Sequence, residues 1–464
     1  MRDAFFRNKK NNPFQEICLN NFSHGGLPVG SLYPNSYYCG MSNLGFQSIC
    51  RLIGEMKSIT LERYFLESEK NKRLLSYENG IDLGRLKIFL ASVSFEEDVL
   101  LMLGMLKRAG IERDRRKRVF PIIIAGGAFV TIAPQVFKNI ADVIYTGYLG
   151  SHQKKKFSNI LQKDFQEKST LLKEFSKIKG AYVPDYNTVN TINYPESAEF
   201  EESVYIAEET QFSNMLLLEI GRGCPFSCCF CSLGHIYKKV LWRDEEEIIK
   251  ICRKAHRTSK ERLNNIGLIA PVPNFHPQIK SILKTLSSIG FKVSLSSLRV
   301  GNTDKEFFEI FKKCGQRTFT IAPEVPGEDE REAIGKRLKT EHIYECLTNA
   351  FSAGFREVKM YFLIGIKGMD NKNDVLELKR FLNAIPVHMK IKLSFNPFVP
   401  KPGTPFEMKE MMNKTKLKKL MNLIKKEISS FKTVSMKFGS LKSFELQYKI
   451  AHADENTIFN LHFS

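Results

Sequence analysis

Three cysteines near the middle of the chain have the spacing of a metal-binding loop. Cys224, Cys228 and Cys231 follow the pattern C-x3-C-x2-C, and Phe230 stands directly before the last of them. Thiolates are ligands for iron and zinc, and a short loop can direct only a few of them to one point. Three thiolates leave one corner of a four-iron cluster open for a substrate or cofactor. The odd number of ligands therefore indicates a reactive cluster.

A structural zinc site is the alternative that this spacing leaves open. Zinc needs a fourth ligand, and His235 lies four residues after Cys231. Cys229 lies inside the motif, but its sulfur cannot easily reach the same point as that of Cys228, so we predict that Cys229 is a packing residue or a dispensable thiol. The other cysteines are scattered, and we expect most of them to be small core residues in a reduced chain: Cys18, Cys39, Cys50, Cys252, Cys314 and Cys346.

The cysteine spacing resembles the cluster loop of the radical S-adenosylmethionine (SAM) superfamily. In that family the open iron of a [4Fe-4S] cluster binds SAM, and an electron from the cluster cleaves SAM to a 5′-deoxyadenosyl radical that abstracts hydrogen from the substrate. The run 215–220 predicts a buried strand before the loop, and 244–247 predicts the start of a helix after it. The resemblance implies an enzyme in which the three cysteines bind the cluster and SAM is the second cofactor.

Six strand–helix units are expected from Met215 onward. Glycines end two of the intervening helices, Gly290 before the third strand and Gly354 before the fifth. Six parallel strands make a partial, TIM-like (β/α)6 barrel that is open on one side for a large substrate, with its reactive groups at the carboxyl ends of the strands. The predicted strands cover 215–220, 266–270, 293–297, 318–322, 358–364 and 391–395.

Polar side chains at two of these strand ends extend the resemblance. Ser297 and Arg299 follow the third strand and Glu324 follows the fourth. Radical SAM relatives use a Ser-x-Arg and an acid in these places to hold SAM, and the family resemblance also assigns Phe230 to the SAM site. An arginine suits the carboxylate of SAM and an acid suits its ammonium group. The alternative is that Arg299 and Glu324 pair with each other at the barrel rim.

Two further strand ends match the family only in part. Leu363 and Gly365 occupy places of a G-x-I-x-G-x-x-E pattern that lies against adenine, whereas the first glycine and the glutamate are missing. After the second strand, Asn274 and His276 stand where relatives often carry Gly-Gly-Glu for the amino group of SAM. Either residue is a candidate for that contact, and His276 alternatively begins a helix.

The amino-terminal half alternates strands with helices, which predicts a doubly wound parallel sheet with any ligand at the carboxyl ends of its strands. The segments 33–35, 40–45 and 124–127 resemble the cobalamin-binding-type domain of a largely uncharacterised radical SAM subgroup. The resemblance makes cobalamin a candidate cofactor. The D-x-H-x-x-G loop that often gives cobalt a histidine is absent, and neither His24 nor His152 has such a setting.

The 464 residues therefore form an α/β protein of two domains with smaller flanking segments. No apolar run is long enough to span a bilayer, and the first residues lack the apolar core of a signal peptide, so we expect a cytoplasmic protein without membrane contact. The predicted parts are an irregular segment 1–25, a cobalamin-binding-like α/β domain 26–156, a linker 157–204, a radical SAM barrel 205–432 and an extension 433–464.

The formal net charge of +20 suits a polyanionic partner such as RNA, but the basic residues are widely spread and mostly lysine, as on solvated faces. We expect a radical SAM enzyme that acts on an unidentified substrate, with methyl transfer as a candidate reaction. Its expected partners are SAM and an electron donor such as flavodoxin or ferredoxin. The alternatives are a methyl or methylthio transferase that modifies RNA or protein, and a non-catalytic iron–sulfur protein that senses redox state.

Overall fold

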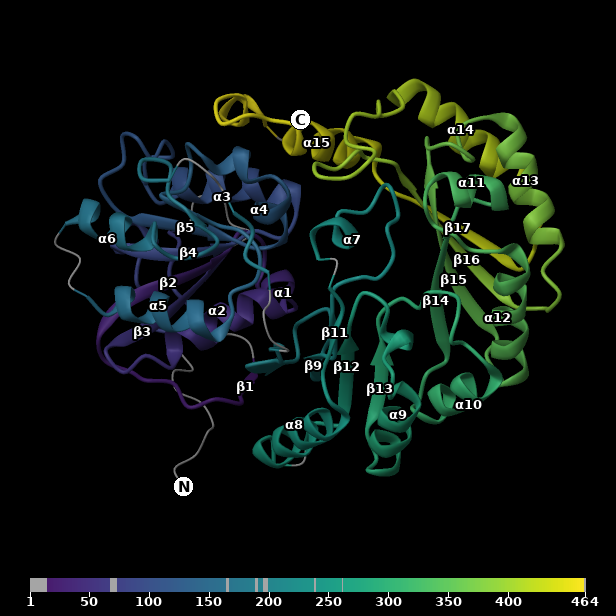
Figure 1. The fold of residues 1–464 in the computed structure, drawn as a ribbon, viewed down its shortest axis with the longest axis horizontal. Helices are drawn as coiled ribbons and strands as arrows, with labels where there is room; N and C mark the ends of the chain where they lie inside the picture. The colour runs from purple at the N-terminus through teal and green to yellow at the C-terminus, as the bar shows by residue number, and fades with distance from the viewer. Residues whose placement is uncertain are drawn as a thin grey trace. The chain divides into compact units, whose positions relative to one another are not determined.

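The protein forms two compact units in the computed structural model, which describes residues 15–66, 73–163, 167–187, 191–194, 199–237, 239–260 and 262–462. Unit 1 comprises Met1–Leu217, Arg257–Leu263 and Lys449–Ser464. Unit 2 comprises Leu218–His256 and Asn264–Tyr448. Figure 1 shows the helices and strands of both units.

Unit 1 is built on a six-stranded sheet in the order β3-β2-β4-β5-β6-β7. The strands pair in parallel except for β7, which is antiparallel to β6. Because the chain passes from β2 to β3 and then to the other side of β2, the strand order reverses between β2 and β4, where ligands of such sheets bind. The strands are β2 (Leu27–Tyr33), β3 (Ile59–Phe65), β4 (Ile88–Ser92), β5 (Ile122–Gly126), β6 (Val143–Tyr145) and β7 (Ala181–Tyr182). The helices are α1 (Tyr37–Gly40), α2 (Leu44–Gly54), α3 (Glu96–Arg108), α4 (Ala128–Ile132), α5 (Ser151–Leu161) and α6 (Lys168–Phe175).

Local sequence explains these elements well. Every residue of β3 and β4 is buried, as expected for strands covered on both faces. The side chain of Asn43 caps α2 by accepting the N–H of Phe46 at 2.9 Å. The carboxylate of Asp98 accepts the N–H groups of Ser94 and Phe95 at the start of α3. The predicted doubly wound sheet is therefore present in this unit.

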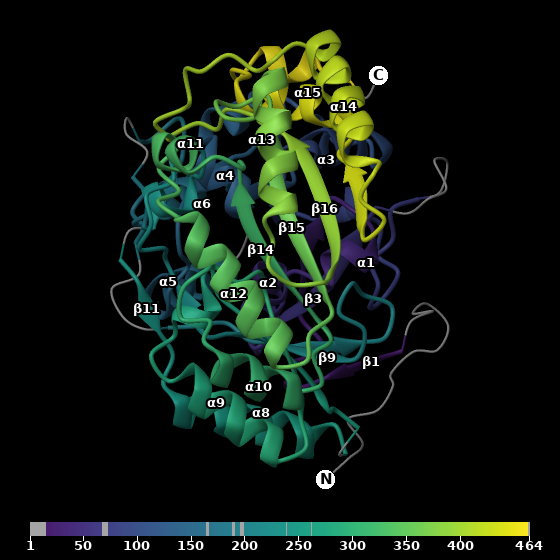
Figure 2. The ribbon, with the colours of Figure 1, turned by 90° about the vertical axis from the view of Figure 1, so that its right-hand side faces the viewer.

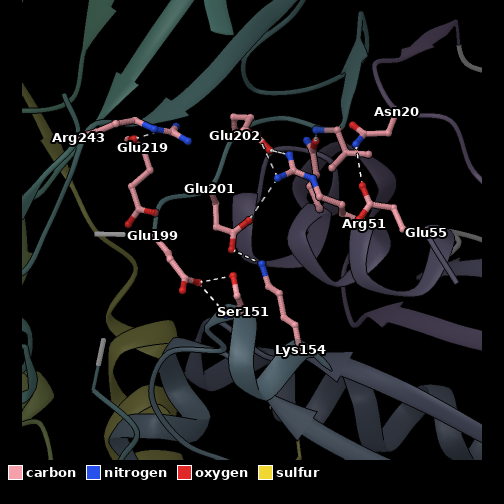
Figure 3. Close-up of polar contacts among 12 residues, drawn as sticks. Asn20, Arg51, Glu55, Ser151, Lys154, Glu199, Glu201, Glu202, Glu219 and Arg243 are labelled. Atoms are coloured by element: carbon pink, nitrogen blue, oxygen red, sulfur yellow. Dashed lines mark hydrogen bonds and ion pairs between the residues drawn. The ribbon is translucent and has the colours of Figure 1, made fainter. Parts of the chain in front are cut away.

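The segment predicted as a linker, 157–204, packs with unit 1 where it is described. It contributes the end of α5, all of α6 and the edge strand β7. Figure 3 shows how three of its glutamates are held to helices α2 and α5. Glu199 accepts from the backbone N–H of Ser151 at 2.6 Å, Lys154 pairs with Glu201 at 2.6 Å, and Arg51 pairs with Glu202 at 3.1 Å. The parts at 164–166, 188–190 and 195–198 lie outside the described residues.

The predicted irregular segment 1–25 contains one short strand. β1 (Glu16–Cys18) pairs antiparallel with β8 (Tyr205–Ala207), and residues 1–14 lie outside the described part of the chain. The pairing is non-local, so the polar composition of this segment does not reveal it.

Two groups of strands follow, with orders β13-β12-β9 and β14-β15-β16-β17, and they belong to unit 2 except for the first three residues of β9, which are assigned to unit 1. The pairs β12–β13, β14–β15, β15–β16 and β16–β17 are parallel, and a parallel bridge joins Leu298 to Ile321 between the two groups. The strands are β9 (Met215–Glu219), β12 (Asn265–Ile269), β13 (Lys292–Leu295), β14 (Thr318–Glu324), β15 (Glu357–Ile364), β16 (Lys390–Pro397) and β17 (Val434–Phe438). All six predicted barrel strands are present, and β17 adds one more.

Helices cover the outer face of this sheet, and Figure 2 shows α12 and α13 in front of β14, β15 and β16. The helices are α8 (Glu245–Thr258), α9 (Ile279–Ser288), α10 (Lys305–Lys313), α11 (Glu328–Ala333), α12 (Thr340–Ser352), α13 (Lys372–Asn383) and α14 (Lys414–Ile428). Alternation of strand and helix along the chain confirms the α/β class and the open barrel expected for this half.

The predicted extension 433–464 is divided between the units. Its first part is β17, which pairs with β16. Its last part follows α15 (Leu441–Ala451) and belongs to unit 1, where Asn139 donates to the carbonyl of Glu455 at 3.2 Å. The extension is therefore not a separate appendage in the part of the chain that the structure describes.

Candidate active site

The cysteine loop begins at β10 (Gly221–Arg222), which pairs antiparallel with β11 (Leu241–Trp242). The base of the loop is closed by a hydrogen bond from the N–H of Cys224 to the carbonyl of Tyr237 at 3.1 Å. Gly223 has φ +82°, and a Cβ there would lie 2.1 Å from the carbonyl oxygen of Lys239. Only glycine fits this close approach, which folds the loop so that its cysteines follow a sharp turn.

The three thiols lie close enough to influence one another. Burial raises the pKa of Cys224, the neighbouring Cys228 raises it further, and the positive charges of Arg299 and Lys336 oppose the shift. Burial likewise raises the pKa of Cys231, while the backbone of Leu233 and Gly234 opposes it and the charges of the other two cysteines add to it. Mutual repulsion of thiolates is relieved when they bind a cation, so this group suits a metal centre.

The thiols fit an iron–sulfur cluster by their chemistry. Among the described residues, no three His, Cys, Asp or Glu side chains already form a metal-binding group. In a four-iron cluster each thiolate binds a different iron, so the three sulfurs do not have to meet at one point. Soft thiolate ligands in one loop with two nearby cations match the donor set and the negative charge of such a cluster.

One ring nitrogen of His235 is hydrogen-bonded to the backbone of the cysteine loop. Its Nε2 lies 3.1 Å from the backbone carbonyl oxygen of Cys228. Zinc coordination through this nitrogen would require that contact to break. This contact occupies one of the two ring nitrogens through which His235 could bind zinc.

Cys229 faces another part of unit 2. Its N–H donates to the carbonyl of Ile334 at 2.9 Å, and its own carbonyl accepts the N–H of Phe406 at 3.2 Å. A Cβ on Gly335 would lie 3.0 Å from the sulfur of Cys229. These contacts agree with the packing role predicted for Cys229.

Arg299 is buried and points toward the cysteine loop. Its guanidinium carbon lies 3.6 Å from the ring centre of Phe226, and one of its nitrogens donates to the backbone carbonyl of Lys336. Another nitrogen lies 3.9 Å from the sulfur of Cys228. The side chain therefore places a positive charge beside the candidate cluster ligands.

Glu324 has a different partner. Its carboxylate lies 3.0 Å from the ammonium of Lys336, and both side chains are almost buried, at 12% and 11% exposure. The residue has φ +72°, a left-handed conformation that is uncommon outside glycine, at a register shift between β14 and β15. The rim pair between Arg299 and Glu324, which the sequence left open, is replaced by the Glu324–Lys336 pair.

Asn274 and His276 are both occupied by the protein itself. The amide of Asn274 is fully buried, donates to the carbonyl of Arg299 at 2.8 Å and accepts its N–H at 3.2 Å. His276 accepts the N–H of Gln278 at Nδ1, so its Nε2 carries the proton donated to the carbonyl of Arg243 at 2.8 Å. Burial lowers the pKa of His276 and keeps it neutral. Asn274 thus positions Arg299, while His276 fixes the chain after β12.

The remaining predicted SAM residues lie in the same unit. Ser297 is exposed after β13, and Phe230 and Leu363 are half-buried in the cysteine loop and β15. Gly365 has φ +80° in the turn after β15, where a Cβ would meet Met412 and a side-chain carbon of Leu417, each at 3.1 Å. Steric crowding alone thus favours glycine at position 365.

Two residues of the site escaped prediction, Phe226 and Lys336. Phe226 lies inside the cysteine motif, so its position was known, but nothing in the spacing indicates that its ring supports Arg299. Lys336 follows Glu324 by twelve residues, and no periodicity connects the two.

Comparison with known protein families decides the class. Residues 218–382 match the family described as "Radical SAM superfamily", and residues 45–184 match "Radical SAM proteins, N-terminal". The chain belongs to the radical SAM superfamily. The radical SAM region runs from β9 to α13 and includes the cysteine loop, Arg299, Glu324 and Lys336. The protein is therefore a radical SAM enzyme, and its cofactors are a [4Fe-4S] cluster and SAM.

Individual proteins are also similar to this chain in sequence. An uncharacterised protein of Methanocaldococcus jannaschii is 27% identical over 92% of this chain and 89% of its own. A probable dual-specificity RNA methyltransferase RlmN of Aquifex aeolicus is 22% identical over 47% of this radical SAM protein and 65% of its own length.

Solved structures show the same fold over most of the chain. The radical SAM methyltransferase TsrM of Kitasatospora setae, solved with cobalamin and a [4Fe-4S] cluster, has a TM-score of 0.54 at 12% identity over 82% of this chain and 74% of that one. The cobalamin-dependent radical SAM enzyme OxsB has a TM-score of 0.54 at 15% identity over 86% of this chain and 56% of that one. Among the described residues of the radical SAM protein, none of the helices has the length and apolarity to cross a membrane.

Proposed function

We propose that this radical SAM enzyme binds its [4Fe-4S] cluster through Cys224, Cys228 and Cys231 and catalyses a methyl transfer. The observation that carries the cluster assignment is the loop of three mutually interacting thiols beside two buried cations. When bound, the cluster supplies the electron that cleaves SAM. The protein's part is to bind SAM, orient it and exclude water from the site.

Arg299 and Glu324 are the residues proposed to orient SAM. Arg299 complements the carboxylate of SAM and Glu324 complements its ammonium group. Because Glu324 is paired with Lys336 at 3.0 Å, the ammonium of SAM would share that carboxylate or displace the lysine. The proposed remainder of the SAM site is Phe230, Ser297, Leu363 and Gly365.

Methyl transfer is supported by the relatives. TsrM and RlmN are both named methyltransferases, one alike in fold and the other in sequence. Two substrate classes are candidates, a small metabolite and RNA. The similarity to RlmN and the net charge of +20 favour RNA as the second of these. Comparison of modified nucleosides and of small metabolites between cells with and without the protein distinguishes these substrates, since only the true product disappears.

Unit 1 is the proposed place for cobalamin. The carboxyl ends of β2 and β4 carry polar side chains that pair with one another: Asn35 donates to Asp98 at 3.2 Å, and Asn43 donates to Ser94 at 3.0 Å. Residues 34–43 and 93–98, which follow these strands, contain no histidine. A corrinoid at this edge would therefore bind without an imidazole ligand from these segments.

Anaerobic reconstitution tests the proposal. The purified protein should bind about four irons per chain and release 5′-deoxyadenosine from SAM under reducing conditions. Replacement of Cys224, Cys228 and Cys231 by alanine should abolish both, and Cys229→Ser is the matched control that keeps both. A full cluster in the triple variant would show that the ligands lie elsewhere.

A further inference from the structure

A short segment after α11 lies directly against the cysteine loop. We call residues 334–338 the strap. The carbonyl of Ile334 accepts the N–H of Cys229 at 2.9 Å. Gly335 has φ +72°, and a Cβ there would lie 2.9 Å from the carbonyl oxygen of Ser227. The strap can therefore approach the loop only because residue 335 is glycine.

Hydrogen bonds from Arg331 fix the strap in place. It is fully buried and donates to the carbonyl of Leu338 at 2.6 Å and to that of Pro326 at 2.6 Å. The N–H of Lys336 donates in turn to the carbonyl of Arg331 at 2.8 Å. A buried guanidinium with several fixed acceptors ties both ends of the 325–340 segment together, so the strap is a preorganised element.

Two groups of Lys336, its backbone carbonyl and its side-chain ammonium, contact residues of the candidate site. Its carbonyl accepts a hydrogen bond from Arg299, and its ammonium lies 3.0 Å from Glu324. The same strap accepts the N–H of Cys229, next to Cys228, through the carbonyl of Ile334 at 2.9 Å. Lys336 thus contacts both residues proposed to hold SAM, and the strap that carries it packs on the loop of the proposed cluster ligands.

We propose that Lys336 is a positioning residue whose carbonyl orients Arg299 and whose ammonium orients Glu324 and eases reduction of the cluster. This inference rests on the proposed ligation of the cluster by the cysteine loop. Reduction adds one electron, taken from a low-potential one-electron carrier, and no atoms, so the site becomes one charge more negative. A fixed, nearly buried cation favours that change, whereas a carboxylate opposes it.

Redox titration of the SAM-free, reconstituted enzyme tests this directly. Reduction by dithionite with mediators is followed by electron paramagnetic resonance in Lys336→Met, Lys336→Arg, Glu324→Gln and the double variant Lys336→Met/Glu324→Gln. Lys336→Met should make reduction of the cluster roughly tenfold less favourable. For one electron this lowers the midpoint potential by about 59 mV. Lys336→Arg should stay near the wild type, and Glu324→Gln should shift in the opposite direction.

The directions of the shifts in midpoint potential distinguish an electrostatic role of Lys336 from a purely structural one. A merely structural role would move Lys336→Met and Glu324→Gln in the same direction, because each breaks the same ion pair. The double variant removes both charges and should return toward the wild-type potential, and it keeps the test valid where Lys336→Met does not fold. Lys280→Met, which breaks surface pairs with Asp304 and Glu306, is the matched control and should leave the potential unchanged.

A wild-type potential in Lys336→Met with its cluster intact would overturn the inference about Lys336 and leave the cluster assignment standing. A potential in the double variant as low as in Lys336→Met would also overturn it. Failure of the wild-type protein to bind a cluster would instead refute the proposed function on which the inference rests.

Discussion

Replacement of Arg299 by methionine separates SAM binding from support of the loop. Methionine keeps an apolar stem of similar length and removes the guanidinium. In the SAM-free protein the change deletes the cation that lies 3.6 Å from the Phe226 ring centre and the donor to the carbonyl of Lys336. It leaves in place the two hydrogen bonds between the side-chain amide of Asn274 and the backbone of Arg299.

The two effects have different sizes. Loss of a desolvated cation–π contact costs about 2 kcal/mol of folding free energy. A buried carbonyl left without its donor costs about 1–3 kcal/mol more. If Arg299 also holds the carboxylate of SAM, loss of that charged contact costs roughly 1.5–3 kcal/mol of binding free energy, so that the affinity falls about tenfold to a hundredfold.

Urea unfolding measures the first effect, and calorimetric titration of SAM into the reconstituted enzyme measures the second. Phe226→Leu is the matched control, because it removes the ring beneath the guanidinium and keeps the charge. We expect Phe226→Leu to lose stability but to bind SAM within about fivefold of the wild type, a difference of roughly 1 kcal/mol. Wild-type SAM affinity in Arg299→Met with a full cluster would refute the role of Arg299 in SAM binding.

Further expectations concern the loop, the cofactor and pH. Cys229→Ser should keep the cluster spectrum and SAM cleavage, whereas Cys228→Ser should lose both; an equal loss in the two variants would mean that the packing role of Cys229 is wrong. Protein grown with cobalamin should show no nitrogen splitting from a protein imidazole in the resonance spectrum of any bound cob(II)alamin, and observed splitting would contradict the proposed histidine-free site. His276 has a lowered pKa in the fold, so the unfolded chain binds its proton first. Stability from this group is therefore complete above about pH 6.5, the ordinary pKa, and declines as the pH falls below it. Thermal melts of the wild type and His276→Gln between pH 5 and 8 test this, since the variant should lose part of the acid-side decline; equal slopes would exclude His276 as its source.

The sequence alone determined most of the elements of the two α/β halves and the class of chemistry. The spacing of Cys224, Cys228 and Cys231 fits one short loop, and continuous apolar runs such as 122–125 fit strands buried on both faces. These signals are local, because the residues that produce them are neighbours along the chain. For the same reason, Arg299 and Glu324 could be placed at strand ends before any coordinates were known.

Partners in space were decided only by the tertiary structure. The sequence left Arg299 and Glu324 free to pair with each other, and the fold instead gives Glu324 to Lys336 at 3.0 Å and directs Arg299 over Phe226. It also joins β17 to β16 and packs the expected linker onto unit 1.

The strap shows why such pairings are hidden in the sequence. Its course depends on left-handed residues, Gly335 at φ +72° and Arg337 at φ +44°, and on carbonyl groups that Arg331 gathers from both ends of the segment. Backbone carbonyls are present at every position and carry no sequence signature, so hydrogen bonds to them cannot be predicted from residue types. Which side chain finds which carbonyl is fixed only when the packed core brings distant segments together.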